Sequence, residues 1–344
     1  MKDAQGREIK YLRISVTDRC NLRCKYCMPN GIECVEHKDI LSFEEIRQIA
    51  ECGAKLGITK IRLTGGEPLA RKGCPQLIRM LKEIPGIEKM AMTTNGTLVR
   101  AILPQLVEAG LDEINISLDT LDAEKFAAIT GQNLLPEVLL AIDAALAAGL
   151  KVKVNAVSMP DTDWKCLISL AKDKPVDVRF IELMPIGAGR RSEGRSNEEL
   201  LEEIRREFPQ LQADEKVHGA GPAVYYQIPG YQGSIGLISA MHGKFCGSCN
   251  RIRLTSTGFL KTCLCYEDGT DLRKILRGER VQQESVSGCA KGSRTRTVQS
   301  GVSGTENKEL LDAMARAIYG KPAEHCFEQP DQITEAHGMS AIGG

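Results

Sequence analysis

The chain of 344 residues lacks an excess of either charge. Lys and Arg together number 45, and Asp and Glu together also number 45, so the formal net charge is zero. Domains that bind DNA or RNA usually carry a basic excess on one face or along one helix. The composition therefore gives no support for a nucleic-acid partner, although a local pocket for an anion is compatible with it.

The chain also lacks an apolar run long enough to span a membrane, and it lacks a charged-apolar-small signal peptide. We therefore expect a cytoplasmic protein without a membrane partner. Its 13 cysteines are an odd number, and six of them fall in two tight groups. Without an export signal, this usage favours reduced thiols that hold metal over disulfide bonds.

Short β-type runs alternate with helical patterns through the first 218 residues. The predicted strands are Tyr11–Thr17, Lys60–Thr64, Lys89–Thr94, Glu113–Asp119, Lys151–Ser158 and Val176–Met184. The predicted helices are Phe43–Leu56, Gln76–Glu83, Ala101–Ala109, Leu134–Ala148, Trp164–Asp173 and Glu198–Phe208. Six successive βα units predict an α/β fold with a parallel sheet and outer helices. Because eight units would close a barrel, six indicate an open, partial (βα)6 barrel of the TIM type.

Residues 219–344 show a different pattern, with short strands separated by Gly and Pro. Val224–Ile228, Ser234–Ile238 and Ile252–Thr255 predict a smaller sheet in a C-terminal α+β region, and Asn307–Tyr319 predicts a helix. Residues 280–305 have no apolar periodicity, so we predict a disordered insert. The last residues, which end in Gly343 and Gly344, are predicted to form a flexible tail.

The first cysteine group is Cys20, Cys24 and Cys27, with the spacing C-x3-C-x2-C. Three thiolates can hold three irons of a [4Fe-4S] cluster and leave the fourth iron open, as in a catalytic metal site. This pattern resembles the radical S-adenosylmethionine (SAM) family, in which the open iron binds SAM and one electron cleaves it to a 5'-deoxyadenosyl radical. The alternative is a zinc knuckle with a fourth ligand elsewhere. The resemblance extends to the aromatic Tyr26 and to the Thr64–Pro68 run TGGEP, which both favour the radical SAM interpretation.

The second cysteine group is Cys246, Cys249 and Cys263, with the spacing C-x2-C-x13-C. It again offers three thiols, and a zinc ribbon that adds Cys265 or His242 is an equal alternative when the group is considered alone. Beside a radical SAM motif, a second iron-sulfur cluster is favoured.

Cations interrupt four apolar strands, and two more lie beside the second cysteine group. A charge inside a barrel is costly unless it is paired, so internal ion pairs with Asp119, Asp177 and Glu182 are one explanation. A polyanionic ligand is the other, because Arg matches phosphate oxygens bidentately and Lys adds a point charge. The six cations are Arg13, Arg62, Lys153, Arg179, Arg251 and Arg253.

The sequence resembles the GTP 3',8-cyclase family of molybdenum cofactor biosynthesis. The resemblance rests on Arg13–Cys20, the TGGEP run, Thr93–Gly96, Asn115–Asp119, Arg179–Met184, Cys246–Arg253 and the terminal Gly343–Gly344. It implies two [4Fe-4S] clusters, SAM as cofactor and GTP as substrate. The implied reaction is hydrogen abstraction from ribose C3', attack of the C3' radical on guanine C8, and reduction of the resulting radical, which gives 3',8-cyclo-7,8-dihydroguanosine 5'-triphosphate.

The same resemblance implies roles for individual residues. Cys20, Cys24 and Cys27 hold the first cluster, and Cys246, Cys249 and Cys263 hold the second, which anchors guanine. SAM is bound by Tyr26, Gly66, Ser117 and Met184. GTP is bound by Arg13, Arg62, Thr93, Lys153, Arg179, Arg251, Ile252 and Arg253. Arg13, Gly343 and Gly344 assist catalysis. The implied partners are a low-potential electron donor and the next pathway enzyme, cyclic pyranopterin monophosphate synthase, and a homodimer is compatible.

Two other functions remain open. A radical SAM peptide-modifying enzyme also carries auxiliary clusters, but it usually has more C-terminal cysteines and lacks the Arg251-x-Arg253 and Gly-Gly features. A non-enzymatic zinc-binding module is the second. Four histidines without ligand spacing are predicted to lie on the surface, namely His37, His218, His325 and His337.

Overall fold

A computed structural model describes residues 1–28, 31, 35–278, 303–339 and 341–342. One sheet of 12 strands organises the described chain, in the order β12-β11-β10-β1-β2-β3-β4-β5-β6-β9-β8-β7. The strands are β1 (Tyr11–Ser15), β2 (Lys60–Thr64), β3 (Lys89–Thr94), β4 (Glu113–Ser117), β5 (Lys151–Ser158), β6 (Asp177–Glu182), β7 (Gln212–Ala213), β8 (Val224–Gln227), β9 (Ile235–Ile238), β10 (Arg251–Leu254), β11 (Phe259–Lys261) and β12 (Thr270–Asp271).

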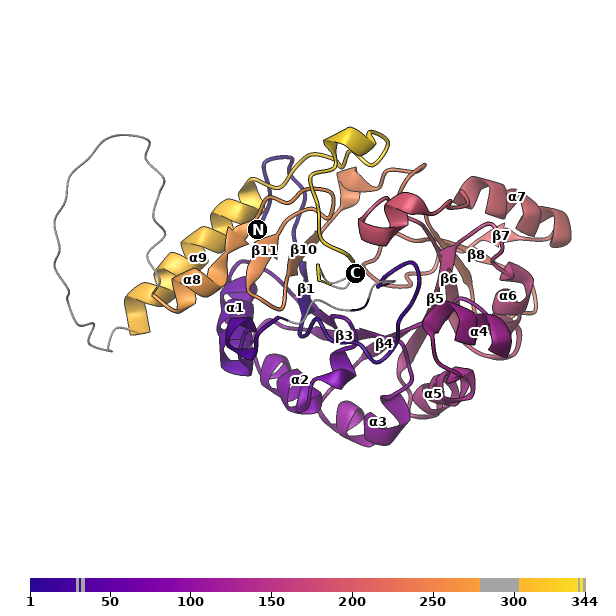
Figure 1. Ribbon diagram of the computed structural model, residues 1–344, viewed down its shortest axis with the longest axis horizontal. Helices are drawn as coiled ribbons and strands as arrows, with labels where there is room; N and C mark the ends of the chain where they lie inside the picture. The colour runs from indigo at the N-terminus through magenta and orange to yellow at the C-terminus, as the bar shows by residue number, and fades with distance from the viewer. Residues whose placement is uncertain (29–30, 32–34, 279–302, 340, 343–344) are drawn as a thin grey trace.

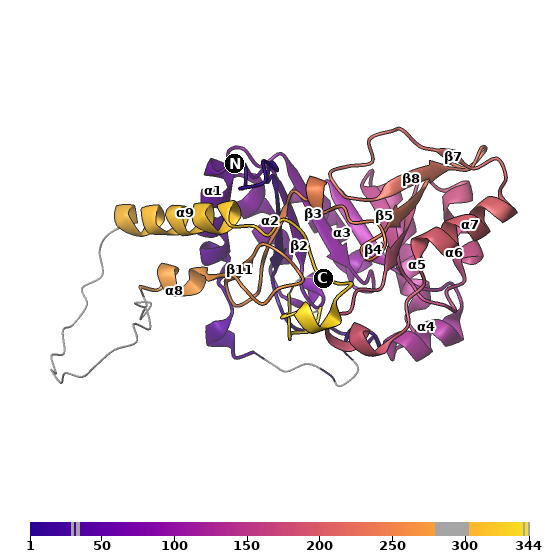
Figure 2. The same cartoon turned by 90° about the horizontal axis from the view of Figure 1, so that it is seen from above.

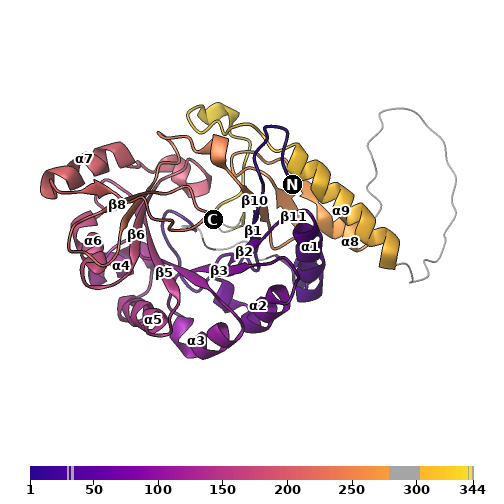
Figure 3. The ribbon, with the colours of Figure 1, turned by 180° about the vertical axis from the view of Figure 1, so that it is seen from behind.

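The first six strands pair in parallel and in sequence order, as the βα pattern predicts. They follow an arc, and the helices that connect them lie on its outer side (Figures 1 and 3). The helices are α1 (Phe43–Lys55), α2 (Cys74–Lys82), α3 (Val99–Glu108), α4 (Ala123–Thr130), α5 (Leu135–Ala147), α6 (Trp164–Asp173), α7 (Asn197–Glu207), α8 (Leu272–Leu276) and α9 (Ser303–Tyr319). The partial barrel is confirmed.

The C-terminal strands correct one expectation. The sequence predicts a separate, smaller sheet after residue 219, but β10 pairs in parallel with β1, and β9 pairs in parallel with β6. These strands therefore extend the barrel sheet at both edges, where unpaired backbone groups would otherwise remain. Since the same sheet continues, the C-terminal region completes the wall around the mouth of the barrel.

Local sequence explains where the helices begin. Ser42 accepts a hydrogen bond from the Glu45 amide and the Glu45 side chain accepts one from the Ser42 amide, so a capping box starts α1. Helix α7 begins at Asn197, one residue before the predicted start, and is capped by Ser196. Helix α4 was not predicted, and it begins at the N-cap Asp122 and ends at Gly131. Only Phe126 and Thr130 of α4 are buried, so its apolar periodicity is weak.

The apolar core lies between the sheet and the outer helices. Residues on the outward face of the strands, such as Leu12, Ile61 and Ile114, are fully buried there. Residues one position away face the inside of the arc instead, because successive strand side chains alternate between faces. This alternation places Arg13 and Arg62 on the inner face.

Helix α9 packs against α1 and α8 beside the β10–β11 edge (Figure 2). It begins at Ser303, so residues 303–305 of the predicted disordered insert are helical. The remainder of that predicted insert, 280–302, lies outside the described residues, as do Gly343 and Gly344. Among the helices that the structure describes, none has the length and apolar character needed to cross a membrane.

Candidate functional site

A single cavity at the inner face of the sheet collects most of the predicted site residues. It is lined by Arg13, Cys20, Cys24, Tyr26, Cys27, Arg62, Gly66, Thr93, Ser117, Lys153, Arg179, Met184, Cys249, Arg251, Arg253 and Cys263. Several of these residues lie at or just beyond the C-terminal ends of parallel strands, where barrel enzymes build their sites. The first cysteine group, two members of the second group and the cations thus open onto one space, whereas Cys246 is not part of its lining.

The first cysteine group lies on the loop after β1, and neighbouring elements fix its shape. The Arg23 and Lys25 amides donate to the carbonyls of Thr130 and Ile129 at the end of α4, at 2.8 and 3.1 Å. Asn95 contributes its Nδ2, which lies 2.9 Å from Asn21 Oδ1 and 3.7 Å from Cys20 Sγ. The helix that sequence reasoning missed therefore supports this loop.

Tyr26 on the same loop is tied to the end of β4. Its hydroxyl donates to Asp119 Oδ2 at 2.7 Å, and Asp119 Oδ1 accepts from the Val157 amide at 2.9 Å. Burial, with the neighbouring Asp119 charge, raises the Tyr26 pKa well above its usual value. Tyr26 is thus a fixed wall of the cavity beside the thiols.

The TGGEP run packs directly on the cysteine loop. The Gly66 and Glu67 amides donate to the carbonyls of Thr17 and Arg19, at 2.9 and 2.8 Å. A Cβ atom at Gly66 would lie 2.4 Å from the Arg19 oxygen and 2.6 Å from the Asp18 oxygen. Glu67 is fully buried and accepts from the Asn95 and Leu69 amides. Burial raises the Glu67 pKa to about 7.

We expect Gly66→Ala to destabilise the fold by about 1–3 kcal/mol, because backbone atoms must move to admit the methyl group. Thermal unfolding of the metal-free protein would measure the loss. Gly247→Ala is the matched control, since a Cβ atom there meets nothing within 4 Å. Equal unfolding temperatures for the two variants would contradict the close approach seen here.

Three arginines from neighbouring strands form a row across the inner face. The register aligns Arg253 of β10 with Arg13 of β1, and Arg13 with Arg62 of β2. Burial and the charge of Arg253 lower the Arg13 pKa well below its usual value. Burial and Arg251 lower the Arg253 pKa to about 10. Like charges gathered in one row, with Arg62 buried and Arg13 and Arg253 half-buried, favour a polyanion, whose charge would offset them.

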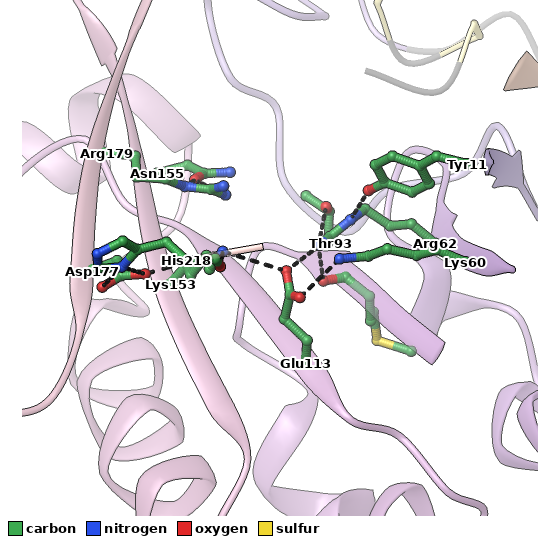
Figure 4. A network of polar contacts seen from close by, with 11 residues as sticks. Tyr11, Lys60, Arg62, Thr93, Glu113, Lys153, Asn155, Asp177, Arg179 and His218 are labelled. Atoms are coloured by element: carbon green, nitrogen blue, oxygen red, sulfur yellow. Dashed lines mark hydrogen bonds and ion pairs between the residues drawn. The ribbon is translucent and has the colours of Figure 1, made fainter. Parts of the chain in front are cut away.

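Glu113 lies among three cations, Lys60, Arg62 and Lys153 (Figure 4). Its carboxylate accepts from Lys60 at 2.9 Å and from the Arg62 guanidinium, and it lies 3.8 Å from Lys153 Nζ. The register places Ala91 between Arg62 and Glu113, so a small side chain lets them meet across β3. Burial alone would raise the Glu113 pKa, but Arg62, Lys153 and Lys60 hold it well below its usual range. Arg62 and Lys153 are therefore ion-paired inside the barrel through Glu113, an acid that the sequence analysis did not name, and of the named acids Asp177 lies 4.0 Å from Lys153.

The surroundings also change the pKa of Lys153. Burial lowers its pKa to about 7, and the charge of Glu113 only partly opposes this. The neighbouring Arg179 donates to Asn155 Oδ1 from Nε and Nη2, at 2.9 and 2.5 Å. Its register partner on β9 is Gly236, where a Cβ atom would lie 2.8 Å from Arg179 Cγ. Gly236 therefore makes the room that Arg179 occupies.

The second cysteine group lies just before β10 and just after β11, at the opposite strand ends from the loop that follows β1. Burial alone would raise the Cys249 pKa, but Arg251 and Lys321 lower it to about 7, which favours the iron-binding thiolate. Burial raises the Cys246 pKa, and the nearby Cys263 and Cys249 add to this effect. Sequence reasoning missed Lys321, a buried lysine in the cavity wall that follows α9 by two residues.

The described thiols fit iron-sulfur clusters by their chemistry. All six are thiols rather than disulfides. Within the described ranges, no three His, Cys, Asp or Glu side chains gather closely enough to hold one metal ion. A [4Fe-4S] cluster offers a separate iron to each thiolate, so its ligands need not meet at one point.

Two alternative ligands of the second group have other contacts. Cys265 Sγ lies 3.1 Å from Cys326 Sγ in a small buried apolar cluster. The His242 ring contacts Glu182 Oε1 at 3.2 Å. These contacts give each side chain a structural role, and the ligand set Cys246, Cys249 and Cys263 remains a prediction.

Some predictions need correction. The Ile252 side chain lies in the main core rather than in the cavity, because it faces the opposite side of β10 from Arg251 and Arg253. His218 and His325 are not surface residues. The His218 side chain is only 9% exposed, and His325 is buried against Phe327.

Comparison with known proteins places this geometry in a family. Residues 14–173 match the radical SAM superfamily, and residues 176–327 match the family described as Molybdenum Cofactor Synthesis C. The two matches meet near residue 175, earlier than the predicted division after residue 218.

Relatives match over the whole chain. A GTP 3',8-cyclase of Clostridium perfringens is 41% identical over 348 residues, and one of Heliobacterium modesticaldum is 45% identical over 352 residues, with 100% of each chain covered in both cases. The SAM-bound crystal structure of Streptococcus suis SuiB is 15% identical, with a TM-score of 0.58 over 77% of this chain and 63% of that one. SuiB shares the fold alone. By its full-length relatives, this chain belongs to the GTP 3',8-cyclase family of radical SAM proteins.

Proposed function

We propose that this protein is a radical SAM cyclase that converts GTP to 3',8-cyclo-7,8-dihydroguanosine 5'-triphosphate, the first step of molybdenum cofactor biosynthesis. The observation that carries the proposal is the shared cavity. The first thiol group, Cys249 and Cys263 of the second group, and the cations all line this one cavity. A nucleoside triphosphate that spans this space would meet a cysteine group at its nucleoside end and cations at its phosphates.

Cys20, Cys24 and Cys27 would hold the first [4Fe-4S] cluster, which supplies the electron that cleaves SAM. Tyr26, Gly66, Ser117 and Met184 line the cavity around these thiols and are proposed to contact SAM. The chain orients the cofactor through the rigid packing of TGGEP on the cysteine loop and through the Tyr26–Asp119 hydrogen bond.

The cations are proposed to bind the GTP phosphates. Arg13, Arg251 and Arg253 share one end of the sheet, whereas Lys153 and Arg179 lie across the cavity from them. Thr93 Oγ1 accepts from Arg62 at 3.3 Å, so Arg62 links this hydroxyl to Glu113. Charge neutralisation by a triphosphate would relieve the repulsion within the arginine row.

Three finer assignments also belong to this proposal. Cys246, Cys249 and Cys263 would hold a second [4Fe-4S] cluster that anchors guanine, and Arg251 and Lys321 would offset the thiolate charge. Arg13, Gly343 and Gly344 would assist the radical step. The electron donor, cyclic pyranopterin monophosphate synthase, a homodimer and a cytoplasmic location stay predictions from the sequence.

Peptide modification has less support. A SuiB structure with a bound precursor peptide has a TM-score of 0.51 at 16% identity, which shows a shared fold and no shared substrate. The buried cations of the cavity wall suit phosphates better than a neutral peptide backbone.

The decisive test follows the hydrogen of ribose C3'. The cyclised product has the atomic composition of GTP, so mass alone does not reveal it. The reconstituted protein should be incubated anaerobically with SAM, dithionite and GTP deuterated at C3', and 5'-deoxyadenosine should be analysed by mass spectrometry. We expect deuterium in the 5'-deoxyadenosine and a new nucleotide that separates from GTP by chromatography. Unlabelled 5'-deoxyadenosine and unchanged GTP would refute the proposal.

A further inference from the structure

The His218 ring is held from three sides next to Lys153, which lines the cavity. It lies in the connection between β7 and β8, a segment that sequence reasoning placed on the surface. Its Nδ1 lies 3.0 Å from both carboxylate oxygens of Asp177, and its Nε2 lies 2.9 Å from Asp214 Oδ2. The Tyr225 ring stacks on it with centroids 3.9 Å apart.

This geometry fits an imidazolium. A neutral imidazole donates from one nitrogen only, so its second nitrogen would turn a lone pair toward a carboxylate. Both His218 nitrogens face carboxylate oxygens, and donation from both requires the charged ring. When both nitrogens donate, His218 places a positive charge directly against Asp177.

Asp177 also faces the proposed phosphate site. Its Oδ2 lies 4.0 Å from Lys153 Nζ, and the Lys153 ammonium donates to the His218 backbone carbonyl (Figure 4). The segment that follows His218 stays close to the same cations. A Cβ atom at Gly219 would lie 3.3 Å from Lys153 Nζ, and one at Gly221 would lie 4.0 Å from Arg179 Nη1. Gly221 and Pro222 line the cavity.

A carboxylate at this position works against phosphate binding. It would offset the charge of Lys153, and it would repel a polyphosphate that approaches Lys153 and Arg179. Glu113 already offsets part of the Lys153 charge from 3.8 Å. A positive charge beside the Asp177 carboxylate would balance it and leave more of the Lys153 and Arg179 charge available to a ligand.

We propose that His218 is a positioning residue for the nucleotide phosphates. Its ring balances the charge of Asp177, and its backbone carbonyl accepts a hydrogen bond from Lys153. This inference rests on the proposed function, because it assumes that Lys153 and Arg179 bind the phosphates of GTP. It adds to that function a residue that contacts no phosphate and yet sets the charge of the phosphate site.

The test compares nucleotides with different numbers of phosphates. Binding of GTP, GMP and SAM to the anaerobically reconstituted protein should be measured by calorimetry for the parent and for His218→Gln. We expect His218→Gln to weaken GTP binding about tenfold and GMP binding about twofold, with SAM binding unchanged. His37→Gln, at an exposed position, is the matched control and should bind all three ligands as the parent does.

A second variant separates charge from packing. Asp177→Asn combined with His218→Gln removes both charges, so GTP binding should return to within about threefold of the parent. This double variant also decides the matter if His218→Gln alone folds poorly. Equal losses for GTP and GMP, no loss at all, or no recovery in the double variant would overturn the role of His218. A parent protein that binds no GTP would instead refute the proposed function.

Discussion

Replacing Cys20, Cys24 and Cys27 together by alanine is expected to abolish SAM cleavage and to remove about half of the bound iron. Two groups of three cysteines predict about eight irons per chain after anaerobic reconstitution, and each group accounts for about four. The three thiols lie in the wall of the cavity beside Tyr26 and Gly66, so no other described thiol at that end can replace them. Iron analysis and quantification of 5'-deoxyadenosine measure the two effects.

The matched variant replaces Cys246, Cys249 and Cys263 by alanine. It should lose the same amount of iron, while SAM cleavage persists because the first group is intact. Cys265→Ala should keep the full iron content, since Cys265 Sγ contacts Cys326 Sγ in an apolar cluster. Full iron in the second triple variant, or halved iron in Cys265→Ala, would show that the second ligand set is wrongly assigned.

The parallel strands could be predicted because their signal is local. Each predicted strand overlaps an observed one, and β2, β3 and β5 have the predicted bounds. The pairing of β10 with β1 and of β9 with β6 could not be predicted in this way. Which edge a short strand joins depends on contacts between residues more than 50 positions apart, and no periodicity records them.

The first cysteine motif and the cations on the strands could be predicted for a similar reason. Cysteine spacing, and a charged residue within an apolar strand, can each be read from one short segment. The partner of a buried cation cannot be read in this way. Glu113 stands at the start of a strand, and it meets Arg62 only because the register places the small Ala91 between them. A small residue between two in-register charges is the signal that could have revealed this pair.

His218 is a second residue whose partners could not be predicted from the sequence. An isolated histidine in a polar segment is predicted to be exposed, whereas here Asp177 from β6 and Asp214 enclose its ring. Asp177 and Asp214 come from different segments of the chain, so no residue spacing around His218 predicts these contacts.

The largest effect on stability is expected for Glu113→Gln. Removing this charge leaves Arg62, which is only 3% exposed, without its carboxylate, and it leaves Lys60 and Lys153 close by. Loss of one partner in a buried ion pair typically costs about 3–5 kcal/mol, and we expect a loss of that size in the free energy of unfolding. Denaturant unfolding of the metal-free protein would measure it. Glu108→Gln removes an exposed partner of Arg79 and should change stability by less than about 1 kcal/mol.

The pH dependence provides a second measurement of the same network. The cations hold the folded-state pKa of Glu113 below its ordinary value of 4.5, so the folded protein keeps the carboxylate where the unfolded chain protonates it. The stabilisation is therefore full above about pH 4.5 and is lost as the pH falls below it. The parent should lose more stability than Glu113→Gln on acidification through this range. GTP should stabilise Glu113→Gln more than the parent, because the phosphates supply negative charge that the variant lacks. Equal pH profiles and equal stabilisation by GTP would mean that Glu113 does not balance the cations of this cavity.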